Sequence, residues 1–498
     1  MDKFAMIIFG ASGDLTKRKL MPALYSLFRE KRLTGDFHIL GIGRTIYSDE
    51  DYRSYISGEL RTFVKSEEQD AALMEAFISH LCYLPMDPAK EEGYAMLRQR
   101  LVELTNEVDP DNLLFYLATP PSLYGVVPLH LKAVGLNTPH SRIIVEKPFG
   151  YDLESARELN KIYASVFKEH QIYRIDHFLG KETAQNVLAF RFANGIFEPL
   201  WNRNYIDYVE ITAVENLGIE QRGGFYETAG ALRDMVQNHL IQLVALTAME
   251  PPAIFNADNF RNEVVKVYES LTPLNEEDLN EHIVRGQYTS SGTKKGYREE
   301  KGVAPDSRTE TYIAMKLGIS NWRWSGVPFY IRTGKQMPTK VTEIVVHFRE
   351  TPHQMFRCSG GNCPRANKLI LRLQPNEGIV LKIGMKVPGA GFEVRQVTMD
   401  FSYAQLGGVP SGDAYARLID DCIQGDPTLF TRSDAVEASW TFFDQVLRYW
   451  KENPDAPLYG YPVGTWGPLE SEAMMHEHGA DWTNPCKNLT NTDQYCEL

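Results

Sequence analysis

The chain lacks any apolar run long enough to cross a membrane, which takes roughly 18 or more consecutive residues. Its N-terminal apolar run, residues 4–9, ends at Gly10 and has neither a basic leader nor a small-residue cleavage site. A secretory signal peptide is therefore not expected. We expect a cytoplasmic protein that does not associate with membranes.

Basic residues are fewer than acidic residues. The 498 residues include 52 Lys and Arg against 65 Asp and Glu, which gives a net charge of −13. Such a surface repels nucleic acid and anionic membranes, so neither is an expected partner. An anionic ligand would have to be held by a local cluster of cations, which makes each basic cluster informative.

Cysteine is sparse and irregularly spaced. The cysteines are Cys82, Cys358, Cys363, Cys422, Cys486 and Cys496. Only Cys358 and Cys363 are close together, and no second pair or nearby histidine completes a zinc site. We expect free thiols in a reducing compartment. His476 and His478 flank Glu477 in a polar stretch that is typical of a solvated loop, so no metal site is predicted.

The length of the chain exceeds what one hydrophobic core usually serves, so two domains are expected. In the first half, short apolar runs at residues 4–9, 37–43, 113–118 and 142–145 alternate with segments that favour helices, such as 49–108 and 153–169. This alternation predicts a doubly wound parallel sheet. Its ligand crevice should lie at the carboxyl ends of the strands.

The first of these strands runs into a glycine-rich turn. The turn consists of Gly10, Ala11, Ser12, Gly13, Asp14 and Leu15, and a helix is expected from about Thr16. Glycines let the backbone approach a phosphate, and a helix N-terminus offers it N–H groups. Because the spacing is not GxGxxG, a simple strand-to-helix turn is the alternative. Lys17, Arg18 and Lys19 oppose the helix dipole, which either an anionic ligand or solvent exposure explains.

Two basic residues follow later strands. Arg44 comes after strand 37–43, where an arginine accommodates the 2′-phosphate of NADP and an acidic residue would bind the ribose of NAD. NADP is therefore favoured, and use of NAD remains open. Lys147 comes after strand 142–145 and should reach into the crevice. The Lys147–Pro148 bond is a candidate cis peptide.

The stretch 174–182 contains Asp176, His177 and Lys181. An imidazole and an ammonium four residues apart, beside a carboxylate, suit the binding of an anion next to a place where protons move. A solvated basic segment is the alternative.

The second half has alternating runs at residues 208–214, 341–347, 369–373 and 379–383, which predict an antiparallel sheet. Residues 229–249 are expected to form one long apolar helix. His239 falls inside its apolar face, with Asp234 and Asn238 one turn apart at the edge. A lone histidine on a buried helix is usually a hydrogen-bonded core residue, but the adjacent Asp and Asn favour a site.

Residues 10–20, 146–150, 174–182, 234–239 and 327–335 together resemble the glucose-6-phosphate dehydrogenase family. The blocks have that family's order and spacing, and the likeness covers essentially the whole chain. It implies a Rossmann-like NADP-binding domain, residues 1–175, and an α+β domain, residues 176–498, with a large mainly antiparallel sheet. The second domain would bind substrate and form the subunit contact of a homodimer or homotetramer.

That family oxidises D-glucose 6-phosphate at C1 to 6-phospho-D-glucono-1,5-lactone and passes the hydride to NADP, the first oxidative step of the pentose phosphate pathway. By resemblance, His239 is the general base for the C1 hydroxyl proton, and Asp176 orients it and stabilises its charged form. The chemistry agrees, because imidazole titrates near neutral pH and an adjacent carboxylate stabilises imidazolium.

The resemblance also implies which residues contact the ligands. The implied substrate-binding residues are His177, Lys181, Lys147, Glu215, Asp234, Lys335, Lys340 and Lys19, of which the first two hold the phosphate. The implied cofactor-binding residues are Gly10, Ala11, Ser12, Gly13, Asp14, Leu15, Arg44 and Lys147.

The chain departs from the family at two places. Phe178 stands where the family usually has a tyrosine that bonds the phosphate, and a lost hydrogen bond to a charged group costs roughly 1.5–3 kcal/mol. Substrate affinity, not the reaction, is the property this puts in question. Arg332 and Arg372 match a second, structural NADP site of animal members, but Val341 and Val345 replace its basic residues. We expect that site to be absent or weak.

Two alternatives remain open on sequence. The first is a related sugar oxidoreductase that acts on an unphosphorylated sugar, although such a sugar needs no paired cations like those of His177 and Lys181. The second is a non-catalytic NADP-binding sensor, although a sensor needs neither Asp176 nor His239.

Overall fold

The structure is a computed structural model, and it describes residues 3–33, 35–107, 111–358, 366–389, 391–406, 413–486 and 497. The chain divides into two compact units. The first contains Met1–Glu182, Pro252–Asn262 and Ser411–Glu437, and the second contains Thr183–Pro251, Glu263–Pro410 and Ala438–Leu498. The expected boundary at residues 175 and 176 lies near the first change of unit, and the two later segments of the first unit come from far along the chain.

The first unit is built on a seven-stranded sheet in the order β16-β6-β5-β4-β1-β2-β3. Its strands are β1 (Lys3–Phe9), β2 (Asp36–Gly43), β3 (Leu81–Pro85), β4 (Leu113–Leu117), β5 (Arg142–Val145), β6 (Ile172–Ile175) and β16 (Phe430–Thr431). Neighbouring strands are parallel except β16, which is antiparallel to β6. This confirms the predicted parallel sheet. The strand order reverses at β1 and β4, where folds of this type bind their ligands.

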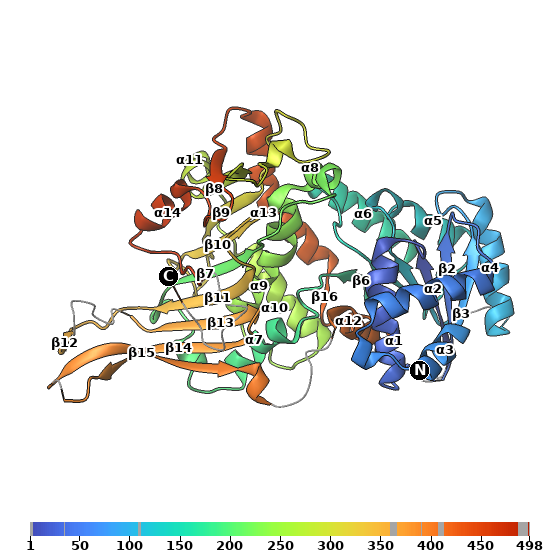
Figure 1. Cartoon of the computed structure of the whole chain (residues 1–498), viewed down its shortest axis with the longest axis horizontal. Coiled ribbons are helices and arrows are strands. Elements are labelled where there is room, and N and C mark those ends of the chain that lie inside the picture. Colours follow the sequence, from blue (N-terminus) through green and yellow to red (C-terminus); the bar gives the residue numbers. More distant parts are fainter. Residues whose placement is uncertain are drawn as a thin grey trace. The chain divides into compact units, whose positions relative to one another are not determined.

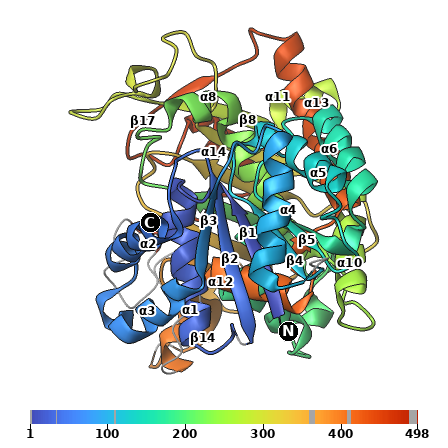
Figure 2. The same ribbon diagram turned by 90° about the vertical axis from the view of Figure 1, so that its right-hand side faces the viewer.

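Helices cover both faces of this sheet. Figure 2 shows α1 (Met21–Arg29), α2 (Asp49–Phe63) and α3 (Ala71–Ser79) on one side, and α4 (Glu92–Thr105), α5 (Val126–Ala133) and α6 (Leu153–Val166) on the other. Right-handed crossovers in opposite directions from β1 produce this arrangement. The central strands are therefore buried on both faces, which explains their unbroken apolar runs.

Three strands of this sheet, β3, β6 and β16, were not predicted from the sequence. The expectation of helix throughout residues 49–108 was wrong at β3, a short edge strand that ends at Pro85 between two helices. Strand β16 is only two residues long and pairs with β6 from more than half the chain away. Helix α12 (Ala414–Gln424) joins the same unit and contacts α1.

The second unit is built on a ten-stranded sheet in the order β12-β15-β14-β13-β11-β7-β10-β9-β8-β17. Its strands are β7 (Ile206–Val214), β8 (Ile283–Thr289), β9 (Tyr312–Leu317), β10 (Phe329–Gly334), β11 (Val341–Phe348), β12 (Arg357–Cys358), β13 (Lys368–Gln374), β14 (Gly378–Lys386), β15 (Glu393–Ser402) and β17 (Tyr459–Pro462). Most neighbours are antiparallel, which confirms the prediction, and β7 pairs with β10 in parallel. Figure 1 shows strands β7 to β15 of this sheet side by side.

The other helices are α7 (Glu182–Phe192), α8 (Gly223–Ala231), η6 (Leu232–Leu240), α9 (Ile241–Ala248), α10 (Ala257–Glu269), α11 (Glu276–Glu281), α13 (Ser433–Glu452) and α14 (Leu469–His476). All of α9 is buried, and η6 contacts both β7 and β10. Among the residues that the structure describes, no helix is long and apolar enough to cross a membrane.

The cysteines differ from expectation at one position. Cys82 and Cys422 are buried free thiols, as expected. Cys486 is disulfide-bonded, so the expectation of free thiols was wrong for this residue. Spacing along the chain does not show which cysteines meet in the fold. Cys363 and Cys496 lie outside the described residues.

Candidate active site

The glycine-rich turn lies directly after β1, at the strand-order reversal. Gly10 has a φ of +90°, and a Cβ there would lie 2.2 Å from the carbonyl oxygen of Ala118, just beyond β4. Only glycine allows both this backbone conformation and this close approach. The Thr16 hydroxyl and the Gly13 N–H both donate to the Gly10 carbonyl, at 3.0 and 2.9 Å, which closes the turn. The geometry fits a phosphate cradle at the start of a helix.

The cations after this turn are partly neutralised within their own helix. Arg18 donates to Asp14 at 2.8 Å, and the Lys17 ammonium lies 3.7 Å from the same carboxylate. Asp14 thus offsets the two charges that oppose the helix dipole, so no ligand is required to explain them. Lys19 and Arg44 are exposed, and Arg44 directly follows β2 at the carboxyl edge of the sheet.

The turn after β5 contains a buried carboxyl beside Lys147. Glu146 is 9% exposed and accepts a hydrogen bond from the Tyr116 hydroxyl on β4 at 2.6 Å. Burial raises the pKa of the Glu146 carboxyl, while Tyr116 and Lys147 act in the opposite direction. Lys147 is half-buried, and the Lys147–Pro148 peptide is cis, which confirms that prediction.

Asp176 directly follows β6, the strand next to β5. It is 4% exposed, and its carboxylate accepts the N–H of Phe178 at 2.8 Å. Burial raises the pKa of Asp176 to about 6, although the charges of His177, Lys147 and Lys181 favour its ionised form. The carboxylate is therefore charged at neutral pH but close to its titration range.

The cations that follow Asp176 are His177 and Lys181, and both are half-buried. The Lys181 ammonium lies 4.0 Å from the centre of the Phe178 ring, a distance at which a cation is attracted to the ring face. The phenyl group therefore contacts the cation directly.

The backbone of this segment is held by its neighbours. A Cβ on Gly180 would lie 2.7 Å from the Ala414 carbonyl oxygen, so the turn passes tightly over the start of α12. Arg174, in the same stretch, points into the fold and pairs with Glu169 at 2.7 Å and Asn160 at 3.0 Å. Within the stretch 174–182, Arg174 therefore has a structural role. Asp176, His177 and Lys181 are the residues that remain as candidates for the site.

In the second unit, the predicted helix of residues 229–249 begins after a kink. Gly230 has φ 63° and ψ 176°, so α8 ends in a kink, and the segment that follows is the π-helix η6. The Glu310 carboxylate accepts the Leu232 N–H at 3.0 Å and so caps the new helix. A Cβ on Gly230 would lie 2.3 Å from that carboxylate. The predicted helix of residues 229–249 is therefore confirmed from Leu232 to Ala248, as η6 followed directly by α9, and was wrong only at its start. The π-helical form was not predicted, and π-helical turns are frequent at functional sites.

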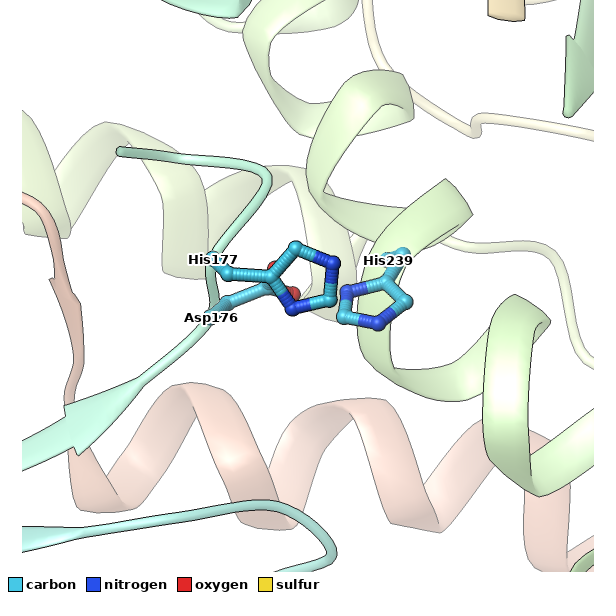
Figure 3. A group of neighbouring side chains, drawn as sticks. All are labelled: Asp176, His177 and His239. Carbon is cyan, nitrogen blue, oxygen red and sulfur yellow. The ribbon is translucent and has the colours of Figure 1, made fainter. Parts of the chain in front are cut away.

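Helix η6 carries Asp234 and His239, which are 7% and 0% exposed. In a π-helix, residues five apart are neighbours, and the Asn238 amide donates to the Arg233 carbonyl at 2.6 Å. Figure 3 shows His239 on this helix, and Asp176 and His177 on the segment that follows β6. The imidazole and the carboxylate belong to different units.

Glu215 and Lys335 form an ion pair in the second unit. They directly follow β7 and β10, which pair in parallel with Val214 opposite Gly334, so the two strands end side by side. The Lys335 ammonium also lies 5.6 Å from the centre of the Tyr226 ring. Lys340, just before β11, is exposed.

The two arginines considered for a second NADP site contact other groups of the same unit. Arg332 donates to the Thr483 carbonyl at 2.7 Å and stacks over the Trp482 ring at 4.4 Å, and Arg372 pairs with Asp400. The absence of a second site stays a prediction.

Sequence analysis missed Glu146, Tyr116 and Glu310. Glu146 stood beside Lys147 in a recognised block, and an acidic residue after a buried strand was the available signal. Tyr116 looked like part of an apolar strand, and Glu310 lies outside every block, so neither had a local signal.

Two family descriptions match the chain. "Glucose-6-phosphate dehydrogenase, NAD binding domain" matches residues 7–186, and "Glucose-6-phosphate dehydrogenase, C-terminal domain" matches residues 188–483. The glucose-6-phosphate 1-dehydrogenase of Aggregatibacter actinomycetemcomitans is 51% identical over 488 residues, 96% of this chain and 97% of the relative. That of Bacillus subtilis is 41% identical over 490 residues, 97% of this chain and 98% of the relative.

Solved structures agree. A glucose-6-phosphate dehydrogenase in complex with its substrate glucose-6-phosphate is 36% identical, has a TM-score of 0.89, and covers 97% of this chain and 99% of its own. A glucose-6-phosphate 1-dehydrogenase from Mycobacterium avium is 35% identical with a TM-score of 0.84, covering 97% of this chain and 98% of its own. The chain belongs to the glucose-6-phosphate dehydrogenase family.

Proposed function

We propose that this protein oxidises D-glucose 6-phosphate at C1 to 6-phospho-D-glucono-1,5-lactone, the first oxidative step of the pentose phosphate pathway. The observation that carries the proposal is the full-length likeness to a solved relative that holds glucose 6-phosphate. This chain retains a buried histidine and buried carboxyls suited to proton transfer, and half-buried cations suited to a phosphate.

NADP is the proposed cofactor, and when bound it accepts the hydride from C1. The first unit suits it, because the backbone at Gly10 lies too close to Ala118 for any side chain and leads into a helix N-terminus. Residues 10–15 would contact its phosphates. Arg44, exposed after β2, would accommodate the 2′-phosphate.

His239 is the proposed general base for the C1 hydroxyl proton, with Asp176 as its partner. A carboxylate beside an imidazole stabilises the charged imidazolium that forms when the proton arrives. The raised pKa of about 6 still leaves Asp176 charged at neutral pH. Assistance of this kind typically contributes about 10²–10⁴-fold to the rate.

His177 and Lys181 are the proposed holders of the sugar phosphate. Because the whole chain carries a net charge of −13, a dianionic substrate needs such a local cluster. The ion pair of Glu215 and Lys335 would open to bind sugar hydroxyls. The other proposed substrate contacts are Lys147, Asp234, Lys340 and Lys19.

One assay tests this function. Purified protein is given glucose 6-phosphate with NADP or NAD, and the absorbance of the reduced nicotinamide is followed. We expect turnover with NADP, and a higher kcat/KM than with NAD. Equal kcat/KM for glucose and glucose 6-phosphate would instead favour an oxidoreductase of unphosphorylated sugars. Absence of turnover with intact NADP binding would favour a non-catalytic sensor.

The remaining assignments belong to the same proposal. The first unit would bind NADP, and the second would bind substrate and form the contact of a homodimer or homotetramer through its large sheet. A cytoplasmic location fits a pathway that uses free NADP and sugar phosphates.

A further inference from the structure

A buried carboxyl that the proposed reaction does not use lies beside the carboxylate that it does use. Glu146 follows β5 and Asp176 follows β6, and these strands are parallel neighbours with Val145 opposite Arg174. Both residues therefore stand at the same carboxyl edge of one sheet. Glu146 is 9% exposed and Asp176 is 4% exposed, so solvent screens neither charge.

The two carboxyls affect each other electrostatically. A negative charge on Asp176 opposes ionisation of Glu146, in the same direction as burial. Coupling of this kind is reciprocal, so ionisation of one carboxyl opposes ionisation of the other. When like charges share a buried site, one of the two carboxyls usually keeps its proton.

The surroundings decide which one keeps it. Asp176 accepts the Phe178 N–H and faces the charges of His177, Lys147 and Lys181. These groups stabilise its ionised form.

Glu146 has weaker support for a negative charge. It accepts hydrogen bonds from the neutral Tyr116 hydroxyl, at 2.6 Å, and from the backbone N–H of Lys147, and the Lys147 ammonium is the one cation that acts on it. The other groups that face it are Tyr124 and Tyr415, whose own ionisation its charge opposes. Each carboxyl accepts a backbone N–H, but one cation acts on Glu146 and three act on Asp176, so the proton is held more readily by Glu146.

We propose that Glu146 is a positioning residue that keeps its proton at neutral pH, so that Asp176 alone carries the negative charge of the pair. The neutral acid, held by Tyr116, fixes the turn that presents Lys147. This inference rests on the proposed role of Asp176 as partner of the base. It is distinct from that role, because it concerns where a proton resides in the resting protein.

The direct test is infrared difference spectroscopy, which needs no turnover. A protonated carboxyl gives a carbonyl band well separated from that of a carboxylate. We expect a protonated-acid band at pH 7 that disappears in Glu146→Gln. In Asp176→Asn the band should be lost at a lower pH than in wild type, because the charge that opposes ionisation of Glu146 is gone. The inference is overturned if no such band is lost in Glu146→Gln, even if the protein proves to be an active dehydrogenase.

The kinetic test compares two substitutions of the same residue. Glu146→Gln mimics the protonated acid, because its amide oxygen still accepts the Tyr116 hydrogen bond. It should keep kcat within about twofold of wild type. The pH at which its activity falls on the acid side should be the same as in wild type. Glu146→Leu removes that bond and leaves the Tyr116 hydroxyl buried without its partner, so activity should fall about tenfold or more.

An equal loss of kcat in the two variants, with the turn intact in a crystal structure, would show that the charge of Glu146 is needed. Tyr116→Phe gives a second check on the anchoring bond. This substitution should raise the KM values of the NADP-dependent reaction more than it lowers kcat, because the position of Lys147 depends on the hydrogen bond from Tyr116 to Glu146. A lowered kcat with unchanged KM would contradict the positioning role.

Discussion

Lys335 donates a hydrogen bond to the carboxylate of Glu215, and the two residues lie 120 positions apart in the chain. They meet because β7 and β10 run parallel and end together. The Lys335 side chain is only 12% exposed, so it is already partly desolvated and held in one direction by Glu215. A ligand hydroxyl that replaced Glu215 as the acceptor would find the lysine in position.

Lys335→Met should therefore weaken substrate binding. The loss of a hydrogen bond from a charged group corresponds to roughly a ten- to hundredfold rise in KM for glucose 6-phosphate. Lys386→Met is the matched control, since Lys386 is exposed at the end of β14 in the same sheet and has no proposed role, and its effect should be several times smaller. Equal effects of the two substitutions on KM would remove Lys335 from the site.

His239→Asn should abolish most turnover while leaving substrate binding nearly unchanged. Asparagine keeps a polar group in the buried position but cannot take a proton at neutral pH. We expect kcat to fall about 10²–10⁴-fold, with the dissociation constant of glucose 6-phosphate, from equilibrium titration, within a few fold of wild type. Near-normal kcat in this variant would show that another group is the base.

Lys181→Ala should raise KM far more for glucose 6-phosphate than for glucose, because only the former carries the phosphate.

Phe178→Leu keeps an apolar side chain but removes the ring that contacts the Lys181 ammonium at 4.0 Å. It should produce a smaller rise, about two- to fivefold, in the same substrate-selective direction. Phe178→Tyr keeps the ring and should bind glucose 6-phosphate at least as well as wild type. A change of equal size for both sugars would exclude a phosphate role.

Asp176→Asn should alter stability in a pH-dependent way. The folded pKa of about 6 lies above the unfolded value, so the folded state binds more protons between about pH 4 and 6. Ionisation in this window destabilises the fold as pH rises, by at most roughly 3 kcal/mol. The variant should therefore gain stability over wild type at pH 7.5 and lose that advantage towards pH 4.

Denaturant midpoints of the ligand-free proteins at pH 4.5 and 7.5 measure this difference. If the midpoint gain of Asp176→Asn were the same at both pH values, burial would not control the ionisation of Asp176.

Gly230→Ala should damage both stability and activity. The φ of 63° costs a residue other than glycine about 1–3 kcal/mol, and the new Cβ would displace the Glu310 carboxylate that caps η6. Because η6 carries Asp234 and His239, kcat should fall with stability. Gly224→Ala, in the same helix α8 and with open space at its Cβ, should be neutral or slightly stabilising. The thermal midpoint and kcat of both variants provide the comparison.

Much of the fold could be predicted because it leaves local patterns. Strands buried on both faces, such as β1 and β5, appear in the sequence as apolar runs. The glycines between β1 and η1 (Thr16–Leu20) indicate a turn in which backbone segments approach closely. Strands β3 and β16 could not be predicted, since one is a short edge between helices and the other exists only through its pairing with β6.

The candidate site shows the same division. The types of residue in the sequence were enough to show which side chains can bind an anion or transfer a proton. The charge and acid–base character of His177, Lys181, His239 and Asp176 belong to the side chains themselves. Only the tertiary structure decided how each is tuned. Burial brings the pKa of Asp176 to about 6, parallel pairing joins Glu215 to Lys335, and the kink at Gly230 sets where the helix that carries His239 begins. The physical reason is that charge, desolvation and packing depend on neighbours in space, and those neighbours come from distant parts of the chain.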